Sequence, residues 1–206
     1  MKRFITTVLV LFLFLSLNAQ RFGVQGGGML SNMKWRNDYF TLNTTVKPGF
    51  LLGVTYDLPL KNTMALNFAL NYKCVGAAFI DSTDLASVRL GYVNLDIAYD
   101  YIFDMNKYKL YAEGGGYFGY LVRAQSVWKH KGQDTKTENL NIGTNDSDDI
   151  LPMDVGVTFG VGVYYGVWKF GIGYQSSIIN LSPDKNHVLR NQMGFLRATY
   201  FFGNKK

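Results

Sequence analysis

The sequence contains few cysteines, prolines and charged residues. Cys74 is the only cysteine among 206 residues, which excludes a disulfide within the chain and a metal site built from several cysteines. Four prolines are too few for a proline-rich linker. Charged residues make up 17% of the chain, and the net charge of +6 comes without a dense Lys/Arg stripe, so we expect no nucleic-acid partner.

Long apolar runs are also scarce. The longest, from Val8 to Leu15, is too short for a transmembrane helix, which needs about 20 apolar residues. It follows the basic start Met1-Lys2-Arg3 and precedes the small residue Ala19, the layout of a secretory signal peptide. We therefore predict a signal peptide at residues 1–19, followed by one mature domain at 20–206. The alternative is a retained N-terminal membrane anchor.

Aromatic residues and glycine are abundant, with 15 Phe, 14 Tyr, 3 Trp and 22 Gly. Apolar side chains alternate with small or polar ones over long stretches, and residues 92–103 are the clearest example. There Val93, Leu95, Ile97, Tyr99, Tyr101 and Phe103 alternate with Tyr92, Asn94, Asp96, Ala98, Asp100 and Ile102. Since successive side chains of a strand point to opposite faces, this period of two predicts strands with one apolar face.

The same alternation recurs often enough to predict eight strands. They lie at 21–30, 46–57, 63–76, 88–103, 109–125, 153–165, 169–180 and 191–202. Their connections alternate between long and short, which is typical of an up-and-down meander with tight turns at one end. We therefore predict an all-β fold, an eight-stranded antiparallel up-and-down barrel.

Alternation alone does not say which face of the barrel is outside. A soluble barrel of the lipocalin kind would bury its apolar face, whereas a transmembrane barrel would turn that face to lipid. The apolar faces end in aromatic residues near the short turns, as at a bilayer interface. The polar faces are mostly Gly, Ala, Asn and Thr, which suit a narrow lumen. The last strand also ends in Tyr200-Phe201-Phe202, close to the C-terminus. These features favour the transmembrane barrel.

Five stretches of the sequence carry a family resemblance, namely 70–76, 91–99, 111–121, 154–162 and 173–180. In this order they resemble the small outer-membrane β-barrel domain family of Gram-negative envelopes, the group that includes PorT-like proteins. One departure is Asp96, where this family often has proline. The resemblance implies an integral protein of the outer membrane. It implies no particular activity, although some members are linked to secretion or gliding machinery.

The candidate site consists of charged residues at the alternate strand positions that are predicted to point into the barrel. They are Lys73, Asp96, Asp100, Glu113, Arg123, Asp154 and Arg197. Lone charges inside a narrow barrel would be costly, so we expect these side chains to pair in a structural network. A polar path or binding pocket is the alternative, although eight strands enclose little more than their own side chains.

The outer loops offer no diagnostic catalytic or metal motif. A rim active site could use His130 or His187 with a nearby serine, Ser126 or Ser182, and an orienting carboxylate, Asp134 or Asp184. No spacing identifies such a site, because a catalytic triad is recognised by geometry. We therefore expect no catalytic residue, cofactor or metal.

The longest loop, 126–152, carries an acidic cluster, Asp146, Asp148 and Asp149. The cluster lacks the glycine and the final glutamate of an EF-hand, so the sequence gives no calcium signature. A loop of this length is the best candidate for a partner surface.

The sequence thus predicts a non-catalytic outer-membrane barrel that serves as a structural, adhesion or secretion-machinery component through its extracellular loops. The alternatives are a lipid-modifying enzyme with a rim active site, or a minor channel. The expected partners are outer-membrane lipids and lipopolysaccharide, the barrel-assembly machinery during insertion, and an envelope protein at the loops.

The mature protein should begin at Gln20 and fractionate with outer membranes. It should also migrate differently on gels before and after heating, because a closed barrel keeps its compact shape in detergent until it is heated. N-terminal sequencing and paired unheated and heated gels check both points. Recovery as a soluble periplasmic monomer would contradict the barrel.

Overall fold

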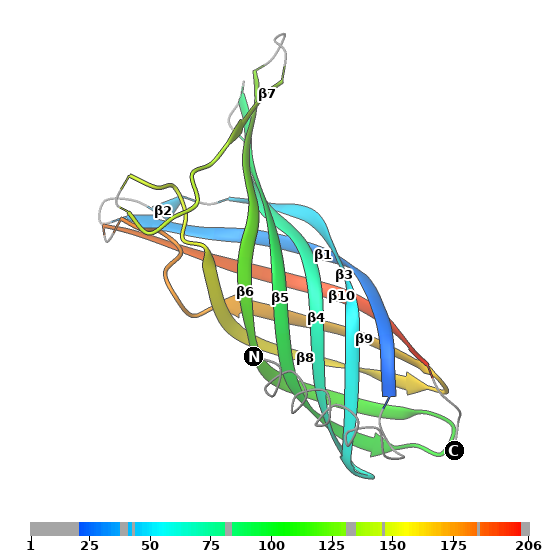
Figure 1. Cartoon of the computed structure of the whole chain (residues 1–206). Coiled ribbons are helices and arrows are strands. Elements are labelled where there is room, and N and C mark those ends of the chain that lie inside the picture. Colours follow the sequence, from blue (N-terminus) through cyan, green and yellow to red (C-terminus); the bar gives the residue numbers. More distant parts are fainter. Residues whose placement is uncertain are drawn as a thin grey trace, which may run out of the picture.

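The computed structural model describes residues 21–37, 41–42, 44–80, 84–130, 135–145, 147–184 and 186–202. The predicted signal peptide lies outside them. The described residues include ten strands (Figure 1): β1 (Arg21–Asn37), β2 (Thr41–Leu42), β3 (Thr45–Lys61), β4 (Met64–Ile80), β5 (Asp84–Asp104), β6 (Lys109–His130), β7 (Lys136–Asn139), β8 (Met153–Tyr165), β9 (Trp168–Ser177) and β10 (His187–Phe202). In this part of the chain, no helix is long and apolar enough to cross a membrane.

Eight long strands form one closed antiparallel ring. Their order is β10-β9-β8-β6-β5-β4-β3-β1, and β1 pairs with β10 from Phe22 opposite Phe202 to Asn37 opposite His187. Each of the eight corresponds to one predicted strand, so the predicted eight-stranded antiparallel barrel is confirmed. The two short strands, β2 and β7, lie beside this ring and pair with β1 and β6.

The two ends of the barrel differ. Tight turns join β3 to β4, β5 to β6 and β8 to β9, and two of them use left-handed backbone, at Asn106 (φ 66°) and Gly166 (φ 61°). The first residues of β1 and the last of β10 lie at this same end, which we call the inner end (Figure 1). The longer connections lie at the opposite, outer end.

Several strands run further than alternation predicted. The ladder between β5 and β6 continues out to Asp84 opposite His130, and β7 adds to β6 opposite residues 125–128. Together these tips extend beyond the mouth of the barrel (Figure 1). Conversely, β9 ends at Ser177 rather than at residue 180, because the chain then folds inward to bury Leu181.

Side chains alternate across the wall of the barrel as predicted. On β5, Ile97 is 42% exposed on the outside, whereas its neighbour Ala98 is 5% exposed inside. The outer face is apolar over most of its height and carries exposed aromatic residues toward both ends. Those toward the inner end include Tyr101, Phe103, Tyr165, Trp168, Tyr200 and Phe202; those toward the outer end include Phe50, Tyr72, Tyr120 and Tyr174.

The interior is filled by side chains in successive levels. A small apolar cluster that includes Ile102, Tyr164 and Phe201 occupies the inner end. Buried polar and charged side chains occupy the middle. A larger apolar cluster that includes Tyr92, Leu121 and Phe195 occupies the outer half, where Ile150 and Leu181 from the outer connections join it.

The outward and inward positions of β5 should respond differently to a new charge. Ile97→Arg should cost about 2–4 kcal/mol of stability near the middle of the bilayer, because the guanidinium would face hydrocarbon. Ala98→Arg would lie inside, beside Asp96 and Asp100, and should depend little on bilayer thickness. Urea unfolding in vesicles of two lipid chain lengths measures both effects. Equal thickness dependence for the two variants would mean that the inside–outside assignment of β5 is wrong.

Candidate functional site in the polar interior and the outer surface

The polar interior arises from the inward positions of all eight strands. On β9, for example, Lys169, Gln175 and Ser177 are buried, whereas Phe170, Ile172 and Tyr174 point outward. Among the described residues, five carboxylates and three basic side chains are buried: Asp57, Asp96, Asp100, Glu113, Asp154, Lys73, Lys169 and Arg197. Because the interior excludes most water, each of these charges needs partners within the barrel.

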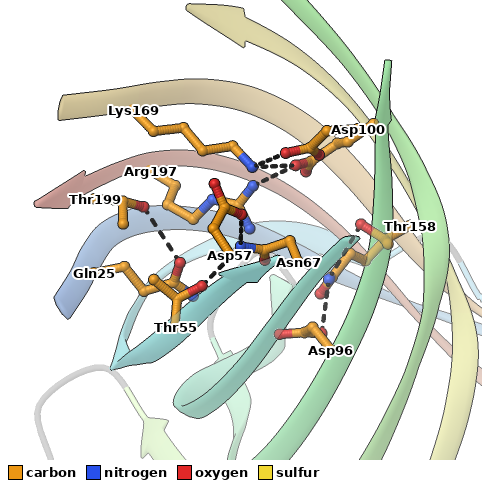
Figure 2. Close-up of polar contacts among 12 residues, drawn as sticks. Gln25, Thr55, Asp57, Asn67, Asp96, Asp100, Thr158, Lys169, Arg197 and Thr199 are labelled. Carbon is orange, nitrogen blue, oxygen red and sulfur yellow. Dashed lines mark hydrogen bonds and ion pairs between the residues drawn. The ribbon is translucent and has the colours of Figure 1, made fainter. Parts of the chain in front are cut away.

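The cluster nearest the inner end is held by two basic residues (Figure 2). Lys169 Nζ lies 2.5 Å from Asp100 Oδ2 and 3.7 Å from Glu113 Oε2. The guanidinium of Arg197 donates to Glu113 Oε2 at 2.6 Å. Glu113 therefore lies between two cations, and the ion pairs join β5, β6, β9 and β10 across the lumen.

Asp57 joins the same cluster through neutral donors. Asn67 Nδ2 donates to Asp57 Oδ1 at 2.8 Å, and the Tyr164 hydroxyl lies 2.9 Å from Asp57 Oδ2 and 2.6 Å from Asp100 Oδ2. Arg21, at the start of β1, lies 3.7 Å from Asp57 and stacks over the ring of Tyr164. The first residue of the described chain thus closes the inner end of the network.

A second cluster lies further along the lumen around Asp96. Lys73 Nζ donates to Asp96 Oδ1 and to Gln175 Oε1, both at 2.8 Å. Asn71 Nδ2 donates to Asp96 Oδ2 at 2.5 Å, and Gln25 Nε2 donates to Asn71 Oδ1 at 2.6 Å. Lys73 is therefore a buried ammonium with one charged and one neutral partner.

Asp154 forms a third cluster, next to the outer apolar residues. Ser177 Oγ donates to its carboxylate at 2.6 Å, Asn191 Nδ2 at 2.9 Å and the Tyr117 hydroxyl at 3.3 Å. Within the described residues, no cation lies within ion-pair distance of Asp154. Three neutral donors can stabilise a buried carboxylate, since each replaces a lost contact with water.

The structure brings six of the seven predicted lumen residues into the interior: Lys73, Asp96, Asp100, Glu113, Asp154 and Arg197. The prediction for Arg123 is wrong, because its side chain is exposed on the outside. Gly91 pairs with Arg123 and Tyr92 with Leu121, so Val122 is an extra residue, a β-bulge. A bulge shifts the alternation by one position and turns Arg123 outward.

Two buried charged residues of the network were not predicted, Asp57 and Lys169. Both lie on the inward parity of their strands, alternating with apolar residues such as Tyr56 and Phe170. Both residues would have been predicted if the alternation of inward and outward positions had been applied to every strand. They lie toward the ends of their strands, next to the tight turns, where a charge is ordinarily solvated.

The interior serves as a cross-linked plug rather than an open passage. Ion pairs and hydrogen bonds connect opposite walls of the barrel, and apolar clusters fill the space on both sides of them. Eight strands leave an interior just wide enough for side chains. This packing argues against a solute pore.

The outer connection predicted as one loop, 126–152, is partly ordered onto the barrel. Its first residues continue β6, its middle forms β7, and Ile142 and Ile150 form a parallel bridge. Ile150 is 2% exposed within the outer apolar cluster. The N–H of Leu151 donates to the carbonyl of Leu181 at 2.9 Å, so two outer connections are joined over the lumen.

The residues considered for catalysis fall in different places. Asp184 Oδ2 lies 2.7 Å from His187 Nδ1, within a tight turn in which the N–H of Asn186 donates to Asp184 Oδ1 at 2.9 Å. This N–H bond first, and the His187 ring second, hold the pKa of Asp184 below its usual value. Ser126 is buried on the inward side of β6. Asp134 and the side chain of His130 lie outside the described residues.

In the acidic cluster of the outer connection, two carboxylates accept hydrogen bonds from backbone N–H groups. Asp148 accepts from the N–H of Asn145 and Asp149 from the N–H of Asn141, both at 2.8 Å. Asp146 is not among the described residues. In the described ranges, no three His, Cys, Asp or Glu side chains are grouped as a metal site would require.

Removing the central cation of the inner cluster should destabilise the barrel. Lys169→Met should lower the free energy of unfolding by about 3–5 kcal/mol, because Asp100 would keep a buried charge without its cation. Lys109→Met removes an exposed lysine near the same end and should leave stability unchanged. Urea midpoints in matched vesicles give both values. Equal midpoints for the two variants would contradict this prediction, because they would show that Asp100 does not need the charge of Lys169 for stability.

Three solved structures illustrate what the chain resembles in the arrangement of its strands. Neisserial surface protein A shares 15% identity with a TM-score of 0.47, covering 90% of this chain and 100% of its own. Ail, the attachment invasion locus protein of Yersinia pestis, shares 15% at 0.43, with the same coverage. OprG from Pseudomonas aeruginosa shares 12% at 0.45, covering 90% and 97%. These similarities are too low to transfer a role.

No curated protein matches the chain significantly. A family model gives a clear assignment, because it covers most of the sequence. The model for the outer membrane protein beta-barrel domain matches residues 16–182. This range includes seven of the eight ring strands and most of the buried charges. The chain therefore belongs to the outer membrane protein beta-barrel domain family.

Proposed function

We propose that this protein is a non-catalytic component of the outer membrane that binds an envelope protein through its outer surface, in a structural, adhesion or secretion-machinery role. The observation that supports this proposal is the projection formed by β5, β6 and β7. These strands continue as a sheet beyond the outer mouth of the closed barrel (Figure 1).

The projection has two features suited to binding a protein. All four residues of β7 are exposed, and among the described residues β7 pairs with β6 alone, which leaves its other edge without a strand partner there. Such an edge can accept an extended segment of another chain as a further strand. Trp128 on the adjacent β6 is 52% exposed. Exposed tryptophans are frequent anchors of protein interfaces.

The packed interior supports a surface role. A channel would need a continuous polar path, whereas the ion pairs of Lys169, Arg197 and Lys73 bridge the lumen at successive levels. The inner and outer apolar clusters add further side chains along the same axis. An interior of this kind stabilises the scaffold and leaves the outer surface as the variable, functional part.

The Asp184–His187 pair makes a rim enzyme the second candidate. A carboxylate that accepts from an imidazole nitrogen orients the ring, as a general base requires. The same contact also belongs to an ordinary turn, since the N–H of His187 donates to the Asp184 carbonyl at 3.2 Å. Mass spectrometry of lipid A distinguishes a catalytic pair from a structural turn. Cells with the parent protein and cells with His187→Ala should differ in their lipid A only if the protein is a lipid-modifying enzyme.

A photo-crosslinking amino acid at Thr137 should capture a discrete partner on intact cells. Trp128→Ala should reduce the crosslinked product at least about tenfold, because loss of an interface anchor typically costs 2 kcal/mol or more. Tyr108→Ala removes an aromatic residue of similar exposure at the inner end and should have no effect. Quantitative immunoblots compare the three. Equal crosslinking in all of them would argue against the projection as a binding surface.

A further inference from the structure

A set of basic residues lies on the outside of the barrel near its outer end, apart from both the lumen network and the projection edge. It consists of Lys34 and Arg36 on β1, Arg89 on β5, Arg123 on β6 and Arg190 on β10, and we call it the basic belt. All five side chains are exposed. Within the described part of the chain, none of them has an ion-pair partner.

The side chains of the belt face away from the lumen. Arg89 lies between Val88 and Leu90, which both pack into the outer apolar cluster, so its own side chain points outward. Arg123 is outward because of the bulge at Val122, which re-aims it from the interior. Lys34 and Arg190 alternate with Met33 and Leu189, which are buried.

Like charges are placed next to one another in the belt. Lys34 and Arg190 are directly opposite each other in the β1–β10 ladder. Arg89 pairs with Gln125 and Arg123 with Gly91, so the two arginines are diagonal neighbours about 7–8 Å apart. Like charges that face each other across strands repel, so both pairs would gain from a bound anion.

The height of the belt matches the headgroups of a bilayer. On β5 the exposed apolar side chains run from Val93 to Phe103, about 33 Å along the strand, which corresponds to about 25 Å across the membrane at a tilt of about 40°. Arg123 is level with Gly91, about 5 Å beyond Val93 on the same scale. The belt therefore begins where hydrocarbon ends.

Gly91 leaves room for a polar niche beside Arg123. A Cβ added at Gly91 would lie 2.5 Å from the Tyr72 hydroxyl and 3.3 Å from Arg123 Cβ. The phenol of Tyr72 thus lies over the glycine, with its hydroxyl next to the base of the arginine side chain. A hydroxyl beside a guanidinium supplies hydrogen-bond donors of the kind that phosphate oxygens accept.

We infer that the basic belt binds the phosphate groups of lipids in the outer leaflet, with Arg89, Arg123 and Tyr72 forming one site and Lys34 and Arg190 a second. The ligand is a membrane-borne phosphomonoester of the lipid A type. Arginine suits this role because its planar donors match phosphate oxygens and its charge persists at every physiological pH. The inference does not depend on the partner surface at Trp128.

The test measures binding of lipid A to the purified mature protein in a neutral detergent. Diphosphorylated lipid A should bind at least about tenfold more tightly than the same lipid after enzymatic removal of its phosphates. The double variants R89Q/R123Q and K34Q/R190Q should each weaken binding of the diphosphorylated form at least about tenfold. Tyr72→Phe should weaken it less, because one donor is lost and both charges remain.

The matched control is K107Q/K109Q, which removes two exposed basic residues at the inner end, one in the β5–β6 turn and one at the start of β6. It should bind lipid A as the parent does. Equal loss in the control and in the belt variants would overturn the inference, because binding would then follow net charge alone. Full competition by inorganic phosphate would overturn the assignment to a lipid. Heat-modifiable migration confirms that each variant is folded, and the two belt sites test the inference independently.

Discussion

The whole structure depends on closure of the backbone ladder. An unpaired N–H or C=O group in hydrocarbon costs several kcal/mol, so every strand that faces lipid needs a partner on both sides. Pairing of β1 with β10 meets this requirement for the last two edges. Closure also divides the side chains into two sets. Those that point outward face lipid and are mostly apolar, and those that point inward must fit a narrow lumen. The projection begins where this constraint ends, because backbone groups outside the membrane can bond to water.

Most of the barrel could be predicted because strand alternation is a local property. The parities of Asp96, Asp100 and Ile97 were each apparent from their immediate neighbours. Arg123 was missed because an added residue at Val122 leaves no mark in the sequence, although it reverses every later position on β6. The burial of Ile150 against Leu181 was also unpredictable, since it depends on packing between two connections that are distant in sequence.

The interior and the outer surface have different chemical characters. Inside, acidic and basic side chains are paired and fixed, and Asp154 is held by neutral donors alone. Outside, near the outer end, the five basic side chains of the belt have no acidic partner among the described residues, whereas Lys136 on β7 pairs with Glu138. A closed network favours one rigid arrangement, whereas unpaired charges remain available for contact with other molecules.

The buried ion pairs also constrain the order of events during membrane insertion. Lys169 is separated from Asp100 by 69 residues, and Arg197 from Glu113 by 84. When β5 and β6 have formed a hairpin, Asp100 and Glu113 therefore still lack the cations that β9 and β10 supply. A half-built sheet in lipid would have two open edges and uncompensated negative charge at once. Entry into the bilayer and closure of the ring are thus coupled, and a hairpin-by-hairpin route is energetically unfavourable.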